Sequence, residues 1–265
     1  MGAEEGGQVS GAIQSVLNAL KILESIGSQQ PVGVSELARH VKLPKSSVQR
    51  ALRTLDHAGW IHPVEGDQTR WELTSWMLAI SLKAFGEYSL RDYAEPAMNE
   101  LRRRTGETIH LVSLDGDSAL VIHRLDSSQP VRAFVQVGSR SPLHATASGQ
   151  AILAFLPDAR VQKIVSGNLE AYTSETVTDV MAITDRLAVV QERGYSVNLG
   201  EWRPEVASIS APILSVDGQA IAAMTISIPI TRYSPGIVDT YGGWVRELTQ
   251  NLTGLGQEAK QRTVP

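Results

Sequence analysis

The N-terminal fold depends on the segment LPKSSVQRALRTLDHAG, which covers residues 43–59. The leucine–proline pair at its start favours a new helix, because proline is well accepted in a first helical turn. Val48, Leu52 and Leu55 then fall on one face of that helix. Gly59 stands where a helix is expected to end. The segment therefore predicts an amphipathic helix with a sharp beginning and end.

The other face of this helix carries donors suited to a DNA groove. The side chains concerned are Lys45, Ser46, Ser47, Gln49, Arg50 and Arg53. Arginine can bind guanine edges or phosphates, glutamine can bind adenine, and short hydroxyls near a helix start can bind phosphate. Residues 39–55 hold five basic side chains and no acid, although the whole chain has a net charge of −4. Each arginine alone would be read as a solvated surface residue, but the order of elements favours binding to double-stranded DNA.

The flanking sequence completes a winged helix-turn-helix. An apolar i, i+3, i+4 stripe over residues 13–23 predicts a first helix, and Ser35 is a candidate cap for a second helix over 36–41. Strand-like runs at 60–64 and 70–73 surround a turn at 65–68 and predict a hairpin. Arg70 on this hairpin is a candidate contact to the DNA backbone or to a minor groove. We therefore assign residues 12–74 to a DNA-binding domain, preceded by a disordered tail over 1–11.

Residues 75–88 are apolar and predict a linker helix. Ser89 is a candidate cap for a further helix that ends near the arginines at 102–104, whose charge suits the helix dipole. A helix between two domains commonly serves as a connector and as a dimer surface. DNA readers of this type usually dimerise so that two helices meet two half-sites.

The remainder, residues 89–265, predicts an antiparallel α+β domain. Two pairs of β-rich runs surround tight turns, at 108–114 with 119–125 and at 206–214 with 220–228. Helical patterns fall near 148–155, 158–166, 180–191 and 236–252. Strands in hairpins with helices between them are typical of a sheet covered by helices.

Composition narrows the function classes. The length of 265 residues fits about two domains, and the absence of cysteine excludes disulfide scaffolds and thiolate metal sites. We expect a cytoplasmic protein, because the chain begins with no apolar leader and has no run long enough to span a membrane. Catalytic signatures are lacking, and His110, His123 and His144 do not have the spacing of a local metal motif. We therefore expect no cofactor, no metal and no enzyme activity.

Several stretches resemble the isocitrate-lyase-regulator (IclR) family of bacterial transcription regulators. In the N-terminal part they are Leu37-Ala38, residues 43–50, residues 52–55 and residues 59–61. In the C-terminal part they are residues 107–111, residues 142–149 and residues 211–213. The resemblance covers roughly residues 12–255 in the right order. It implies a DNA reader joined to a GAF-like effector domain, assembled as a homodimer or as a dimer of dimers.

The resemblance also implies an effector site. Its residues would be Ala147, Ser148 and Gly149 at a helix start, facing Asn198, Glu201, Ser208 and Ser227. Small residues and free N–H groups at such a start suit a carboxylate, although Thr146 capping a packed helix would give the same pattern. The chain departs from the family pattern at three places. Only Glu201 remains of a run of acidic residues, Ser208 stands where the family often has cysteine, and Gln150 stands where a basic residue is common. Trp202 is either a wall for an aromatic ligand or a surface loop residue.

The sequence thus predicts a ligand-responsive transcription regulator, either repressor or activator, of bacterial genes that are expected to be catabolic. Its partners would be double-stranded operator DNA and a small organic acid, for which an aromatic acid is one candidate. One alternative is an enzyme whose C-terminal domain acts on a small substrate while the N-terminal domain serves as a tether. Another is a scaffold whose winged helix binds protein.

Overall fold

The computed structural model describes residues 11–64, 66, 68–85 and 90–254. Most of the predicted tail, the turn residues Glu65 and Asp67, the predicted cap Ser89 and the end of the predicted second domain lie outside these ranges. The chain divides into two compact units, Met1–Phe85 and Gly86–Pro265, and each is described by itself. The division falls inside the predicted linker segment 75–88.

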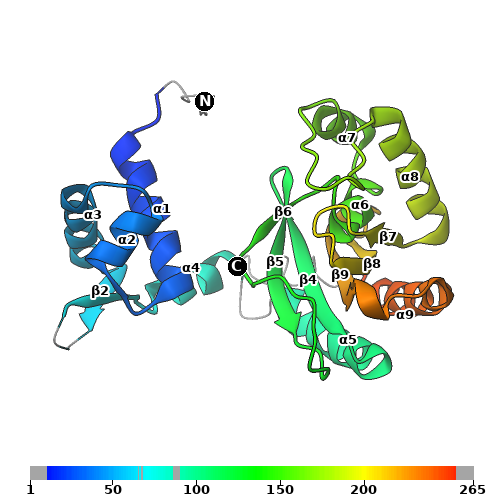
Figure 1. Cartoon of the computed structure of the whole chain (residues 1–265), viewed down its shortest axis with the longest axis horizontal. Helices are drawn as coiled ribbons and strands as arrows, with labels where there is room; N and C mark the ends of the chain where they lie inside the picture. Colours follow the sequence, from blue (N-terminus) through cyan, green and yellow to red (C-terminus); the bar gives the residue numbers. More distant parts are fainter. Residues whose placement is uncertain (1–10, 65, 67, 86–89, 255–265) are drawn as a thin grey trace. The chain divides into compact units, whose positions relative to one another are not determined.

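The first unit is the predicted winged helix-turn-helix (Figure 1). Its elements are α1 (Gln14–Gln29), β1 (Val32–Gly33), α2 (Val34–His40), α3 (Lys45–His57), β2 (Ile61–Val64), β3 (Arg70–Leu73) and α4 (Trp76–Phe85). The three strands form an antiparallel sheet in the order β1-β3-β2. The short strand β1 was not predicted, and α2 is capped by the Glu36 carboxylate, which accepts the Gly33 N–H at 3.1 Å, rather than by Ser35.

The core of this unit forms where the three helices meet. Val48 and Leu52, from the predicted inner face of α3, are 0% and 1% exposed. They pack with Ile22 and Ile26 of α1 and with Leu37 of α2. Burial of such side chains contributes about 1.5–3 kcal/mol each. The packed inner face leaves the opposite face of α3 to solvent.

The apolar stripe of α1 is only partly covered within the unit. Leu23 is buried as expected, but Ile13, Val16 and Leu20 are 66%, 51% and 51% exposed. The reason is that the core contacts come from the second half of the helix, from Ile22 onward. The first half of α1 therefore presents an apolar surface.

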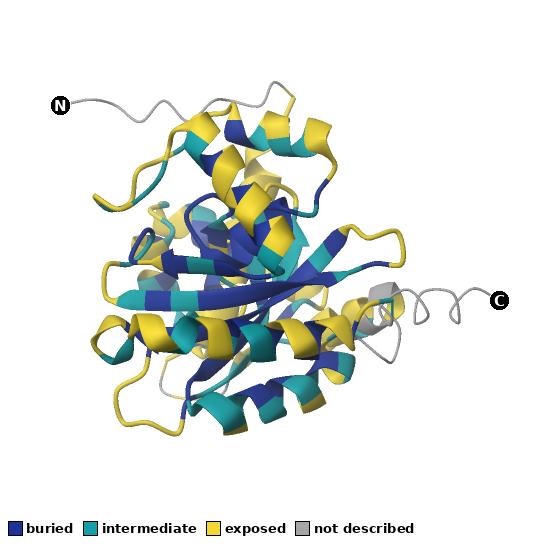
Figure 2. Ribbon diagram, turned by 90° about the vertical axis from the view of Figure 1, so that its right-hand side faces the viewer, coloured by how far each residue is buried: buried dark blue, intermediate teal, exposed yellow. Residues whose placement is uncertain are grey.

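The second unit is the predicted antiparallel α+β domain. Its strands are β4 (Thr108–Asp115), β5 (Ser118–Leu125), β6 (Arg140–Pro142), β7 (Ser196–Leu199), β8 (Val206–Leu214) and β9 (Ala220–Pro229), in the order β6-β5-β4-β9-β8-β7. Its helices are α5 (Leu90–Thr105), α6 (Ala147–Leu153), α7 (Asp158–Val165), α8 (Val180–Arg193) and α9 (Val238–Gln250), with short 3₁₀ turns at Ile230–Arg232 and Pro235–Ile237. Helices α5 and α9 cover one face of the sheet, and α6 with α8 covers the other. The buried residues follow the central strands between these layers (Figure 2).

Strand alternation gives the two faces of the sheet different chemistry. Ile209 of β8 and Ile226 of β9 belong to the core shared with α5 and α9. Their neighbours Ser208, Thr225 and Ser227 point to the α6 side, because successive strand residues face opposite ways. This polar stretch on an otherwise apolar sheet marks the position of a cavity.

Candidate functional site

The outer face of α3 is a free cationic surface. Lys45, Ser46, Gln49, Arg50 and Arg53 are exposed, and Ser47 is half-buried. Within the residues that the structure describes, none of the three basic side chains has a carboxylate at ion-pairing distance. The helix can therefore present its donors to an external anion without first breaking an internal ion pair.

Arg70 is placed differently from the residues of α3. Its guanidinium donates to the Pro31 carbonyl at 2.7 Å and pairs with Glu36 at 2.9 Å. These contacts join β3 to the start of α2. The Arg70 side chain thus already has protein partners, whereas the side chains of Arg50 and Arg53 have none among the described residues.

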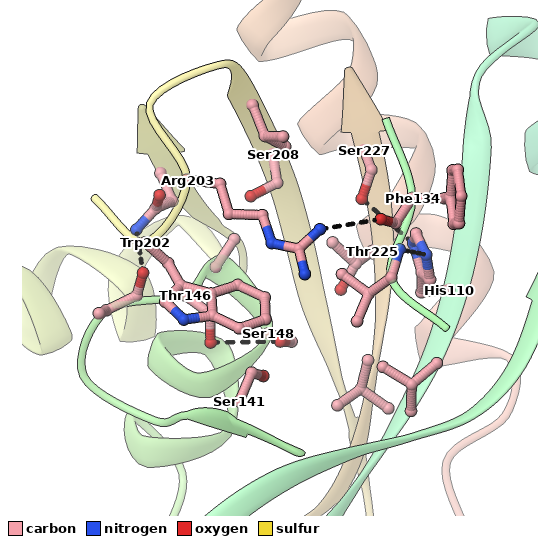
Figure 3. A pocket seen from close by; sticks show the side chains of 17 residues that line it. His110, Phe134, Ser141, Thr146, Ser148, Trp202, Arg203, Ser208, Thr225 and Ser227 are labelled. Carbon is pink, nitrogen blue, oxygen red and sulfur yellow. Dashed lines mark hydrogen bonds between the residues drawn. The ribbon is translucent and has the colours of Figure 1, made fainter. Parts of the chain in front are cut away.

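A cavity lies in the second unit, between the polar face of the sheet and the start of α6 (Figure 3). It encloses about 570 Å³ of space, its opening included. Its lining residues are His110, Val112, Val121, Phe134, Val135, Ser141, Ala145, Thr146, Ala147, Ser148, Asn198, Trp202, Arg203, Val206, Ser208, Thr225 and Ser227. Valine and aromatic side chains supply apolar walls, hydroxyls supply hydrogen-bonding groups, and Arg203 supplies a positive charge.

His110 lines the cavity, and its hydrogen bonds determine which ring nitrogen carries the proton. The Val135 N–H donates to its Nε2 at 3.0 Å, and its Nδ1 is 3.1 Å from the Ser227 Oγ. Because Nε2 accepts, a neutral ring must carry its proton on Nδ1 and donate it to Ser227. Burial, together with the nearby Arg124 guanidinium, lowers the pKa of His110 from 6.5 to about 4. His110 is therefore neutral near pH 7, and the Ser227 hydroxyl keeps its own proton to donate.

The start of α6 forms one wall. Thr146 caps the helix by accepting the Gly149 N–H at 3.2 Å. Ala147 and Ser148 line the cavity, but Gly149 does not. Gly149 instead packs against the Leu143 backbone, where an added Cβ would lie 2.2 Å from the carbonyl oxygen. The pattern of small residues thus serves close packing at Gly149 and leaves room for a ligand at the two residues before it.

The predicted residues of the opposite wall separate into two groups. Asn198, Ser208 and Ser227 line the cavity. The Glu201 carboxylate is buried outside it, where Arg186 donates at 2.7 Å and Gln150 at 3.2 Å. Burial raises the pKa of Glu201 despite the neighbouring Arg186. Among the described residues, the cavity lining consequently contains no carboxylate.

Sequence reasoning missed several lining residues. His110 and Thr225 could have been found, since each shares a strand face with polar or cavity-lining neighbours in an alternating run. Phe134 and Arg203 lie in segments without regular structure and carry no such signal. Trp202, for which two interpretations were open, lines the cavity.

Two other kinds of site are absent from the described ranges. No group of three or more histidine, aspartate or glutamate side chains is arranged to hold a metal ion there, and His110, His123 and His144 do not form one. Among the same residues, no helix combines the length and the apolar character needed to cross a bilayer.

Both units match known families. Residues 15–65 match the IclR helix-turn-helix domain, and residues 82–253 match the C-terminal domain of bacterial IclR transcriptional regulators. The HTH-type transcriptional regulator KdgR of Escherichia coli is 33% identical over 231 residues, which are 87% of this chain and 88% of the relative. The transcriptional repressor IclR of the same species is 28% identical and covers 92% of this chain and 90% of its own length.

Solved structures show the same fold. The C-terminal domain of E. coli KdgR superposes with a TM-score of 0.55 at 32% identity, over 62% of this chain and 95% of that one. An IclR homologue from Microbacterium hydrocarbonoxydans, complexed with 4-hydroxybenzoate, superposes with a TM-score of 0.75 at 24% identity, over 93% of this chain and 99% of that one.

Proposed function

Because the chain belongs to the IclR family and is a DNA-binding transcription regulator, we propose that α3 contacts its operator and that a small organic acid binds in the cavity. Binding of the acid changes the affinity for operator DNA. The regulated genes would be those that handle the acid or its precursors. Whether the protein represses or activates them depends on where the operator lies.

On the DNA side, the proposal rests on the exposed face of α3. Arg50 and Gln49 have the donor geometry for base edges, while Lys45, Ser46 and Arg53 suit phosphates. Arg70 is assigned a lesser role, a contact to the DNA backbone, because its guanidinium is already paired with Glu36. Ser47 is placed at the start of the helix, close to where a phosphate would lie.

The observation that carries the ligand proposal is the charge of the cavity. Its lining, as far as the structure describes the chain, has one arginine, several hydroxyl groups and an amide, but no carboxylate, because Glu201 turns away toward Arg186. Such a lining attracts an anion and can satisfy its oxygen atoms by hydrogen bonds. Valine and aromatic walls suit an apolar body. The relative complexed with 4-hydroxybenzoate binds a molecule of this chemical type.

Assembly into a homodimer or a dimer of dimers is part of the proposal. The first half of α1 and the beginning of α4 expose large apolar side chains, among them Ile13, Leu20, Trp76 and Leu78. Exposed apolar surface of this kind favours contact between subunits. A dimer would place two α3 helices on two half-sites. The acid would act by binding with different affinity to two arrangements of these helices.

We assign no catalysis to the cavity. Ser227 and His110 are the residue types of a nucleophile and its general base, but the ring nitrogen that faces Ser227 already carries a proton. A general base must accept the hydroxyl proton, whereas Nδ1 of His110 donates to Ser227 because Nε2 accepts the Val135 N–H. An enzyme acting through this pair would first have to lose the Val135 contact.

Two measurements test the proposed function. Operator sequences are selected from a random duplex library, and their affinity should fall steeply as salt rises, because lysine and arginine release counterions from the phosphates. A panel of monocarboxylic acids is then screened for a rise in melting temperature, since a ligand of the folded state stabilises it. At least one acid should both raise the melting temperature and change operator affinity. An acid that stabilises the protein yet leaves operator affinity unchanged would contradict the coupling.

A further inference from the structure

The segment of residues 131–137, here named the strap, joins β5 to β6 and passes beside the cavity. Phe134 and Val135 of the strap line the cavity, and Val131 and Val137 are exposed. Figure 3 shows Phe134 across the cavity from Trp202, with the Arg203 side chain extending between them. The strap is therefore a wall whose position affects any bound molecule.

The strap is attached through its backbone. His110 accepts the Val135 N–H, as described above. Three arginines donate to strap carbonyls: Arg232 to Val131 at 2.8 Å, Arg203 to Phe134 at 3.1 Å and Arg124 to Val135 at 3.4 Å. Arg232 also pairs with Glu107 at 2.6 Å, and Arg124 pairs with Asp126 at 2.8 Å. Among the described residues, Arg203 has no carboxylate at ion-pairing distance, so it differs from the other two.

Arg203 is held in place by neutral partners. Its guanidinium lies 4.6 Å from the centre of the Trp202 ring, and its Nη1 donates to the Phe134 carbonyl. A guanidinium has five N–H donors in a planar fork, so the edge formed by Nε and Nη2 can donate to a carboxylate while Nη1 keeps its bond. Hydrogen bonds to a carboxylate are roughly twice as strong as those to a neutral acceptor.

We propose that Arg203 binds the carboxylate of the ligand through this second edge, so that how firmly the strap is held depends on the charge of the ligand. The inference rests on the proposed function, because it concerns the same cavity. The bound anion orients the guanidinium, and the oriented guanidinium holds Phe134. A charged ligand therefore holds the strap more firmly in place than a neutral molecule of the same shape does.

The lining also determines how many negative charges the ligand can carry. Arg203 is the single cationic side chain among the described residues of the lining, and His110 is neutral near pH 7. A second carboxylate on the ligand would be buried without a positive partner, which is costly. The ligand class is thus a singly charged carboxylic acid, preferred over the corresponding dicarboxylate and over the neutral amide.

The test compares monocarboxylic acids with their primary amides and with dicarboxylates of similar size, by melting temperature and by titration. The unsubstituted protein should prefer the monocarboxylate. Arg203→Gln should bind it roughly ten- to a hundredfold more weakly, as expected for loss of a charged hydrogen bond, and Arg203→Lys should keep part of the preference. Arg160→Gln is the matched control, because Arg160 also donates to a backbone carbonyl, that of Gly116 at 2.6 Å, outside the cavity.

Hydrogen–deuterium exchange of the strap supplies a second readout. The monocarboxylate should slow exchange over residues 131–137 in the unsubstituted protein and in Arg160→Gln, but not in Arg203→Gln. If Arg203→Gln binds the acid as tightly as the unsubstituted protein, the role of Arg203 is refuted while the proposed function stands. If no acid of the panel stabilises the unsubstituted protein, the ligand part of the proposed function fails, and this inference fails with it.

Discussion

Replacing His110 by glutamine should remove a large part of the acid sensitivity of this protein. In the folded chain the imidazole is buried, and its pKa falls from 6.5 to about 4. In the unfolded chain it regains its ordinary pKa. Unfolding at a pH between these values therefore takes up a proton, and each pKa unit corresponds to about 1.4 kcal/mol.

The sign follows from the depressed pKa. Stability from the neutral His110 is fully present above pH 6.5 and is lost as the pH falls toward 4. Between about pH 7.5 and about pH 5, this one residue should lower the free energy of unfolding by about 2 kcal/mol. Glutamine does not titrate and retains an acceptor for the Val135 N–H, so the variant should lack that contribution.

Urea unfolding followed by tryptophan fluorescence at the two pH values measures the effect. The decisive quantity is the difference between the two proteins in how much stability each loses on acidification, because contributions from all other groups cancel. His57→Gln, which removes an imidazole from the exposed surface of α3, is the matched control. Equal losses in the unsubstituted protein and in His110→Gln would refute the assignment of a buried neutral imidazole.

Two further predictions concern packing and DNA binding. Gly242→Ala should destabilise the protein by about 1–3 kcal/mol, because its Cβ would lie 2.4 Å from the buried Tyr195 ring. Gly243→Ala should be neutral or stabilising, because its Cβ would have nothing within 4 Å. Thermal unfolding of both variants tests this, and equal effects would contradict the clash. Arg50→Ala should weaken operator binding by about 1–3 kcal/mol and relax specificity at one base pair. Lys163→Ala removes the same charge from α7 and should leave binding unchanged, so equal losses in the two variants would show that only net charge matters.

Much of the fold follows from local patterns. The inner face of α3 was predicted from the spacing of Val48 and Leu52, and both are buried. The hairpin of β4 and β5 and the pair β8 and β9 fall within a residue or two of the predicted runs. Alternation and amphipathic spacing carry this information, because each strand or helix must turn its apolar side chains toward one layer. The short strands β1 and β6 lack such a pattern, since they exist only through pairing with longer strands.

The cavity was predicted only in part, because it is assembled from separate segments. Of the residues that the family resemblance assigns to an effector site, Ala147, Ser148, Asn198, Ser208 and Ser227 line this cavity. The placement of Glu201 depends on Arg186 of α8, which comes close to it only in the folded unit. No local pattern could have indicated that this carboxylate faces away from the cavity.

The order of residues alone was sufficient for the helices and the long strands and for the cationic face of α3, because each depends on neighbours within a few positions. Tertiary structure decided which polar groups meet. It brought Val135 onto His110, which determines the proton position of the ring. It also brought Arg203 to Phe134, with no carboxylate of the described residues at ion-pairing distance from Arg203. The physical reason is that charge and hydrogen bonding act over a few ångströms in space, whatever the distance between the residues along the chain.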